Sequence, residues 1–303
     1  MDADGPPPAA TVAALTHRVP RRPDEARAFA LAPDVWSLVL LLPYLQLRSV
    51  NAYLLALDDG LTLVDCGSSL PPAWEALEVA VRRTGRLIPL EDRRRRARGE
   101  GVPERELTTL IGPIIADDGR HQRAAFDRVL RPGEVLAGRH ARWEVIPAPG
   151  HSSAQCVLFD ARRRWLISAD LVGDVPMLEF GTMADPVELQ CASMDHVLAL
   201  EASRMLPGHG RPVEGAEVRR RVLSARHALE AMVAAACRAL AAGPLTGYAL
   251  SERLDPGNVD LEWRQSALST SLCLLEHLES RGEAHASRDG DGVRRFHAGP
   301  GPR

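Results

Sequence analysis

Three short motifs constrain the fold of this chain most strongly, because each places a potential metal ligand directly after a strand-like apolar run. The ligands are His151, Asp170 and His209. The motifs that hold them are Ala148-Pro149-Gly150-His151-Ser152-Ser153, Ile167-Ser168-Ala169-Asp170 and Leu206-Pro207-Gly208-His209-Gly210. A single His after Pro-Gly is usually a turn residue, and a single Asp after a strand is usually a cap. The three motifs therefore indicate a metal site only as a series.

Short apolar runs separated by turn residues predict an antiparallel sheet early in the chain. These runs cover residues 36–42, 52–57 and 61–64. A helix follows at Pro71, where apolar residues recur at helical spacing up to Gly85. Further strand-like runs at residues 143–146, 156–159 and 165–168 repeat the strand-rich pattern in the second half.

The character of the chain changes at about residue 216, where an Ala- and Leu-rich helix begins and runs to residue 242. Thr246 can cap a short helix, and a longer one carries an apolar stripe from Leu261 to Leu278. Two strand-like runs then flank Asp289-Gly290-Asp291-Gly292, which favours a tight hairpin turn. We expect a flexible leader, a first domain, and a helical linker with a second domain, at residues 1–33, 34–215 and 216–303.

The composition is typical of a soluble globular protein, with 45% hydrophobic and 25% charged residues. All 37 basic residues are Arg, which we attribute to GC-rich codon usage. The five cysteines form no CxxC pair and fit a reducing cytoplasm. The start of the chain lacks the layout of a signal peptide, and the apolar run at residues 35–47 is too short to span a bilayer. We therefore expect a cytoplasmic protein without membrane contact.

Together with Leu63-Val64-Asp65-Cys66-Gly67, the motif series resembles the metallo-beta-lactamase superfamily over about residues 37–213. The resemblance implies an α/β fold, the αββα sandwich, with Asp65 in a structural role. It implies that His151 binds a first metal, that Asp170 bridges two metals, and that His209 binds the second. Zinc suits imidazole and carboxylate ligands, and a water activated by the metal attacks a carbonyl or phosphoryl centre.

The chain departs from the superfamily pattern because the HxHxDH segment, which supplies four metal-binding groups, is missing. In one alignment Pro113-Ile114-Ile115-Ala116-Asp117-Asp118 is its degenerate remnant. In the other, which we favour, the motif was deleted near residues 87–91, and residues 101–130 form a helical insertion. Either alignment leaves three ligands, enough for one divalent metal at most, and the alternative of no bound metal stays open.

The C-terminal segment, about residues 246–297, resembles the winged helix found in one branch of metallo-beta-lactamase-like hydrolases, which includes a single-strand endoribonuclease. Its expected recognition helix carries Glu262, Glu276 and Glu279 against a single Arg264. This balance argues against groove binding and favours a role in closing the active site or in forming a homodimer. Arg294 and Arg295, on the expected wing, remain candidates for contact with phosphate.

Three functions are compatible with these observations. The first is a divergent metal-dependent hydrolase of a thioester, lactone or similar small ester. The second is a pseudoenzyme that lost its metal motif and serves as a scaffold or binding protein. The third is a nuclease or nucleic-acid-binding protein acting through the winged helix.

Overall fold

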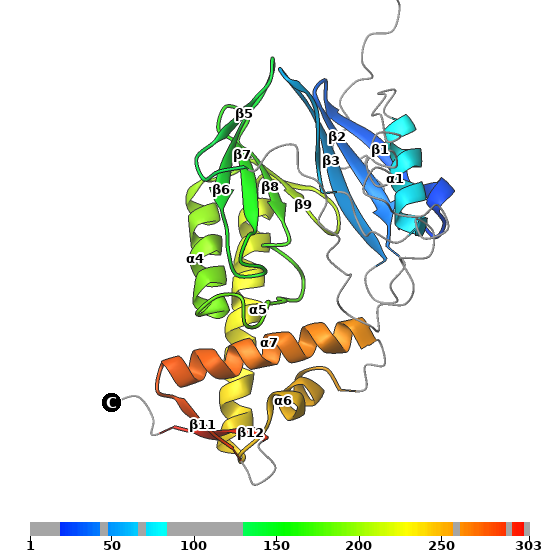
Figure 1. Ribbon diagram of the computed structural model, residues 1–303. Coiled ribbons are helices and arrows are strands. Elements are labelled where there is room, and N and C mark those ends of the chain that lie inside the picture. Colours follow the sequence, from blue (N-terminus) through cyan, green and yellow to red (C-terminus); the bar gives the residue numbers. More distant parts are fainter. Residues whose placement is uncertain are drawn as a thin grey trace, which may run out of the picture. The chain divides into compact units, whose positions relative to one another are not determined.

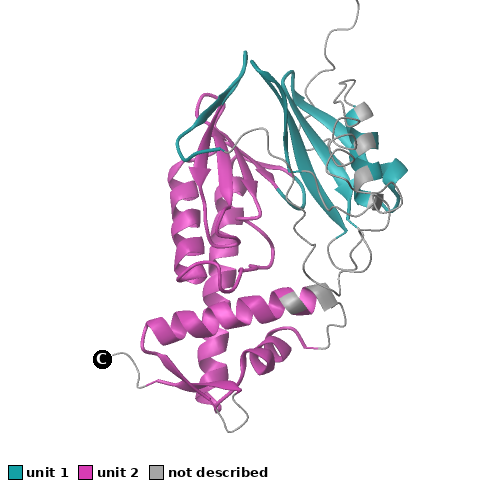
Figure 2. Ribbon diagram, viewed as in Figure 1, with its two compact units in different colours: residues 1–142, 208–211 teal, residues 143–207, 212–303 magenta. Residues whose placement is uncertain are grey.

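The computed structural model describes residues 19–42, 48–65, 71–83, 130–256, 261–288 and 293–299 (Figure 1). The chain forms two compact units (Figure 2). Unit 1 comprises Met1–Arg142 and Gly208–Arg211, and unit 2 comprises Trp143–Pro207 and Pro212–Arg303. Within the part of the chain described, none of the helices combines the length and hydropathy that a bilayer-spanning segment needs.

Unit 1 is built on a four-stranded antiparallel sheet in the order β1-β2-β3-β4. Its strands are β1 (Arg27–Ala32), β2 (Val35–Leu41), β3 (Ser49–Leu57) and β4 (Gly60–Val64). The helix α1 (Pro71–Arg83) buries Ala76, Leu77 and Ala80 against apolar residues of β2 and β3. Unit 1 also holds a 3-10 helix, η2 (Pro23–Glu25), and the short β5 (Val135–Ala137).

The sheet of unit 2 contains a parallel pair, β8 with β9, next to antiparallel neighbours on either side. The strands are β6 (Arg142–Pro147), β7 (Cys156–Asp160), β8 (Trp165–Ala169), β9 (Arg204–Pro207) and β10 (Val213–Glu214). A parallel pair needs a crossover, and here the helix α4 (Pro186–Ala199) lies in the connection from β8 to β9. The Asp185 side chain caps α4 by accepting from the Glu188 N–H at 3.0 Å, and Pro186 follows as the first helical residue.

Three helices and a hairpin complete unit 2: α5 (Ala216–Ala241), α6 (Gly247–Leu254), α7 (Leu261–Ser280), and the strands β11 (Ala284–Arg288) and β12 (Arg294–Ala298). One buried core continues from β6 and β7 through α4 and α5 to α7 and Phe296 of the hairpin. The expected domain boundary between residues 215 and 216 stays a prediction. The long helix α5 belongs to the same core as the elements on both sides of that boundary.

The strands and helices expected from periodicity are present, and the Thr246 hydroxyl accepts from the Ala249 N–H at 3.1 Å, as expected for a cap. Residues 27–32, which lie within the expected leader, form β1 and pair with β2, and their alternate residues Ala28 and Ala30 pack on the core. The helix–helix–hairpin order agrees with that expected at the C-terminus, and its designation as a winged helix stays a prediction. Both alternatives for the missing motif fall outside the described residues.

Candidate metal site

His151 lies in the turn after β6, and its orientation is fixed by a backbone carbonyl. Its Nδ1 lies 3.0 Å from the Met177 carbonyl oxygen. A carbonyl oxygen only accepts hydrogen bonds, so this contact requires the proton on Nδ1. In the neutral ring, Nε2 then carries a lone pair, which is the arrangement that metal-binding histidines usually show.

The turn that carries His151 packs directly on α4. Gly150 has φ +139°, and a β-carbon at this position would lie 2.3 Å from Gln190 Oε1 and 2.5 Å from Gln190 Cα. The Ser193 hydroxyl donates to the Pro149 carbonyl at 2.8 Å. Glycine is therefore required at position 150, because only a backbone without a side chain fits this close to the helix.

Asp170 follows β8 and lies beside His151. Asp170 Oδ2 is 3.7 Å from His151 Nε2, and both side chains are partly exposed, at 31% and 29%. The preceding residue, Ala169, has φ 45°, a left-handed conformation that is costly for a residue with a β-carbon. On the other side, the Gln190 amide donates to the Leu171 carbonyl at 2.8 Å. Gln190 therefore contacts the backbone next to both candidate ligands.

His209 belongs to unit 1, where β3 holds its loop. His209 Nδ1 lies 2.9 Å from the Ser49 carbonyl oxygen. The Asn51 N–H donates to the Gly208 carbonyl, and the Asn51 side-chain amide donates to the Gly210 carbonyl, each at 2.7 Å. Asn51 is 1% exposed, so both bonds are shielded from water. His209 thus shows the same Nδ1-to-carbonyl contact as His151.

The residues fit a divalent metal in donor type and orientation. His151 Nε2 and Asp170 Oδ2 face each other at a separation that a shared cation with bonds of about 2.1 Å can bridge. Among the described residues of either unit, no three His, Cys, Asp or Glu side chains lie close enough together to hold a metal ion as one group. The structure thus brings together two of the three predicted ligands, and His209 is oriented separately in unit 1.

Other residues singled out in the sequence have structural surroundings. Asp65 follows β4 with φ 63°, at the end of the strand where the superfamily resemblance predicts a structural Asp. The Arg294 guanidinium contacts Glu276 at 2.6 Å and Glu279 at 2.7 Å. These ion pairs raise the pKa of Arg294 against the opposing effect of burial. The phosphate contact through Arg294 and Arg295 stays a prediction, and two carboxylates already bind the first of these guanidinium groups.

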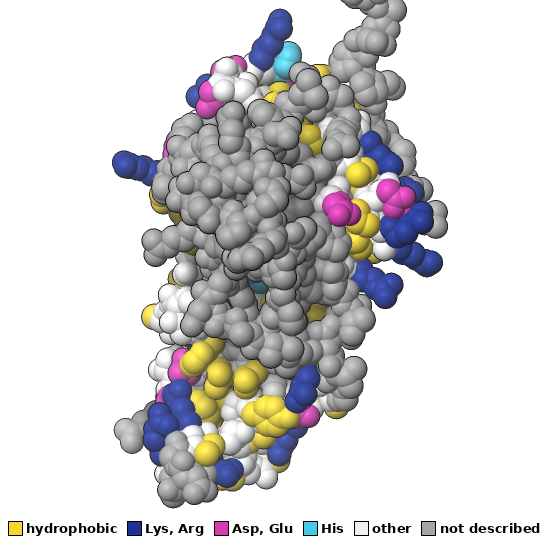
Figure 3. All heavy atoms as spheres, turned by 45° about the vertical axis from the view of Figure 1, so that its right-hand side comes forward, with side chains coloured by type: hydrophobic (Ala, Val, Ile, Leu, Met, Phe, Trp, Pro, Cys, Tyr) yellow, Lys and Arg dark blue, Asp and Glu magenta, His cyan; other side chains and the backbone are white. Residues whose placement is uncertain are grey.

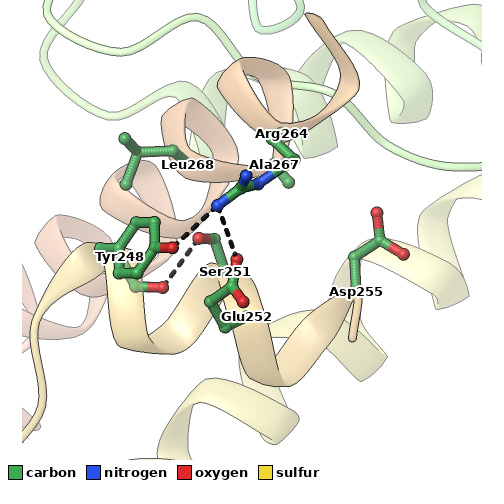
Figure 4. Close-up of a pocket in the computed structure, with 7 residues that line it drawn as sticks. All are labelled: Tyr248, Ser251, Glu252, Asp255, Arg264, Ala267 and Leu268. Atoms are coloured by element: carbon green, nitrogen blue, oxygen red, sulfur yellow. Dashed lines mark hydrogen bonds and ion pairs between the residues drawn. The ribbon is translucent and has the colours of Figure 1, made fainter. Parts of the chain in front are cut away.

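A small cavity of about 190 Å³ lies between α6 and α7 (Figure 4). The Arg264 guanidinium donates to the Tyr248 hydroxyl at 2.8 Å and pairs with Glu252 at 3.3 Å. Figure 3 shows hydrophobic side chains between basic ones on the part of the surface formed by the C-terminal elements. Tyr248, which lines the cavity, is 53% exposed. Since Arg264 and Glu252 bind each other and none of the three candidate metal ligands lines it, this cavity is not the candidate active site.

Comparison with known proteins agrees with this architecture. Residues 98–209, which include all three candidate ligands, match the family model described as the metallo-beta-lactamase superfamily. The structure is similar to a metallo-beta-lactamase family protein from Thermus thermophilus, with a TM-score of 0.69 and 22% identity, covering 89% of this chain and 100% of that one. A beta-lactamase domain protein from Burkholderia ambifaria gives a TM-score of 0.69 and 22% identity, covering 93% and 96%. No curated protein sequence matches the chain.

The chain therefore has the metallo-beta-lactamase fold, and the resemblance to that superfamily is confirmed. The sequence analysis missed the residues that hold the candidate ligands in place, namely Met177, Gln190, Ser193 and Asn51. A signal existed for α4, because Asp185-Pro186 followed by Glu188 is typical of a helix start. A signal also existed for Asn51, a polar residue within an apolar strand.

Proposed function

We propose that the chain is a divergent metal-dependent hydrolase that acts on a thioester, lactone or similar small ester. The match to the metallo-beta-lactamase superfamily supports a hydrolase-type function. The observation that carries the proposal is the His151–Asp170 pair. Its imidazole is oriented by Met177, and its Nε2 faces the carboxylate at 3.7 Å.

In this proposal His151 and Asp170 hold one divalent cation, with zinc as the cofactor that suits nitrogen and carboxylate ligands, and His209 stays the third ligand predicted from the sequence. The chemistry supplied by the bound zinc would be polarisation of the substrate carbonyl and a water made acidic enough to react near neutral pH. The protein contributes orientation. The Met177 and Ser49 carbonyls keep the Nδ1 atoms of the two histidines protonated and their Nε2 atoms available.

The proposed partner is a small molecule, and the proposed location is the cytoplasm. The nuclease alternative loses support, because Arg294 on the β11–β12 hairpin is neutralised by Glu276 and Glu279. A homodimer through the C-terminal segment remains compatible with the exposed Tyr248 and Val293. Neither observation bears on the substrate itself.

The proposal is tested by assaying the purified protein against a panel of thioesters, lactones and aryl esters, after loading with zinc or manganese. We expect His151→Ala and Asp170→Asn to lose activity by at least about 100-fold, since each removes a ligand. His227→Ala is the control, because this exposed residue of α5 lies outside the site. Absence of hydrolysis by the metal-loaded wild type would favour the pseudoenzyme that serves as a scaffold. Equal activity in all variants would contradict the role of His151 and Asp170 as ligands of a catalytic metal.

A further inference from the structure

We infer that the C-terminal helix α7 is part of the candidate site, with Ser269 and Thr270 as positioning residues for His151. They act through the segment of residues 177–180, which lies between α7 and the His151 turn. The assignment of His151 as a metal ligand rests on the proposed function. The contacts that fix its ring do not.

Two consecutive hydroxyl groups on α7 hold one side of the segment. Ser269 donates from Oγ to the Leu178 carbonyl at 2.7 Å and accepts from the Phe180 N–H at 2.9 Å. Thr270 Oγ1 accepts from the Leu178 N–H at 3.0 Å. Thr270 is 2% exposed and Leu178 is 3% exposed, so the bond between them is made away from solvent. A helix offers few free backbone groups in its middle, and here side-chain hydroxyls replace them.

The intervening residues of the segment face the His151 turn. The Met177 carbonyl accepts from His151 Nδ1 at 3.0 Å. Glu179 Oε2 accepts from the Ser153 N–H at 3.4 Å. Residues 177 and 179 thus contact the turn, while residues 178 and 180 contact α7, which is the alternation of an extended chain. A shift of the segment along α7 would therefore move the carbonyl that orients His151.

A second contact ties the same region to α7 about two turns further on. His277 Nδ1 lies 2.9 Å from Asp185 Oδ2, and the His277 side chain is 9% exposed. Asp185 also caps α4, the helix whose Gln190 packs on Gly150. The helix α7 therefore holds residues 177–185 at both ends. One end contacts His151 directly through Met177, and the other end caps α4, which packs on the His151 turn.

The C-terminal segment is therefore necessary for orienting a ligand and is not an appended module. Without the hydroxyls of Ser269 and Thr270, the Leu178 and Phe180 backbone groups lose their partners and the Met177 carbonyl loses its fixed position. His151 is then free to choose either tautomer. Changes beyond the direct ligands of a metal typically weaken its affinity about 10–100-fold.

The test uses long-range proton–nitrogen NMR of the metal-free full-length protein, with the His151 signals assigned from a His151→Gln variant. Zinc affinity is measured in parallel by competition with a chromophoric chelator. In the wild type we expect one His151 tautomer, with the proton on Nδ1. In Ser269→Ala/Thr270→Val we expect a mixture of tautomers and zinc affinity weakened by about 10-fold. Thr270→Ser, which keeps a hydroxyl at this position, should show the wild-type signals.

The matched control is Ser271→Ala, on the next position of α7. Ser271 is fully buried, and its hydroxyl has no hydrogen-bond partner among the residues that the structure describes. If the double variant does not fold, Ser269→Ala alone decides, since it removes two of the three contacts. A wild-type tautomer in the folded variants would overturn the inference. A wild type that does not bind zinc would overturn the proposed function instead. It would leave the inference standing, because the His151 tautomer is measured in the metal-free protein.

Discussion

The backbone of Gly150 lies so close to Gln190 of α4 that a β-carbon at position 150 would come within 2.5 Å of the Gln190 Cα. The same glutamine donates to the Leu171 carbonyl, next to Asp170. One helix residue thus fixes the spacing between the turn of His151 and the loop of Asp170.

Gly150→Ala should therefore destabilise the fold by at least about 2 kcal/mol, because the helix backbone must move and φ +139° is strained for alanine. Gly181→Ala is the control, since Gly181 has φ +81° with no neighbour within 4 Å. We expect it to cost about 1 kcal/mol. Urea unfolding of both variants measures the difference. Equal stabilities would show that the contact with Gln190 carries no constraint.

Asn51 should be the residue that keeps the His209 loop on β3. Asn51→Ala removes the donor to the Gly210 carbonyl inside the core, which should cost about 1–3 kcal/mol. Because His209 then loses its fixed loop, zinc affinity should fall as well. Thermal unfolding and chelator competition report the two effects. A variant with normal stability and affinity would exclude a role for Asn51 in holding this loop.

The Asp185 side chain caps α4 and also contacts His277. Two substitutions distinguish the effect of these hydrogen bonds from the effect of the carboxylate charge. Asp185→Asn can still accept from the Glu188 N–H, and its NH2 group, in the place of Oδ2, can donate to His277 Nδ1 in the other tautomer, so we expect a loss below about 1 kcal/mol. Asp185→Ala removes both acceptors and should cost about 2–4 kcal/mol. Denaturant midpoints of the two variants give the comparison. A larger loss in the Asn variant would mean that the carboxylate charge, not its hydrogen bonds, stabilises this region.

The buried thiol of Cys273 predicts a loss of stability at high pH. Burial raises the pKa of Cys273 from 9.0 to about 12, so the folded state keeps the thiol neutral where the unfolded chain ionises. Its contribution is complete below pH 9 and is lost as the pH rises towards 12, at roughly 1 kcal/mol per pH unit. The stability of Cys273→Ala should fall less steeply than that of the wild type between about pH 8 and 10. Parallel curves would contradict the shift.

Much of the fold followed from periodicity in the sequence. The strands β2, β3, β6, β7 and β8 and the helices α5 and α7 have regular apolar patterns, which predict elements without knowledge of the tertiary structure. The helix α4 was missed, although Asp185-Pro186 is a start signal, because two of its buried positions are polar. Gln190 and Ser193 face the loops of the site and interrupt the apolar stripe. Such polar positions make sense only once their partners are known.

The candidate ligands could be named from the sequence, but the residues that orient them could not. His151 and Met177 are 26 positions apart, and His209 and Ser49 are 160 apart. Both contacts use a backbone carbonyl, so the identity of the residue that provides it leaves no trace in the sequence. The contact of Leu178 with Thr270 is equally non-local, at a separation of 92 positions. Residue types predict chemistry, while the tertiary fold determines which groups meet.

The most direct test of the proposed metal site is the metal content of protein purified without chelator, measured by elemental mass spectrometry. The wild type should hold about one equivalent of zinc, manganese or iron per chain, and His151→Ala and Asp170→Ala should each lose most of it. His227→Ala should retain the wild-type amount. A wild type without metal, even after reconstitution, or a metal content in the His151 and Asp170 variants equal to that of the wild type, would contradict the account.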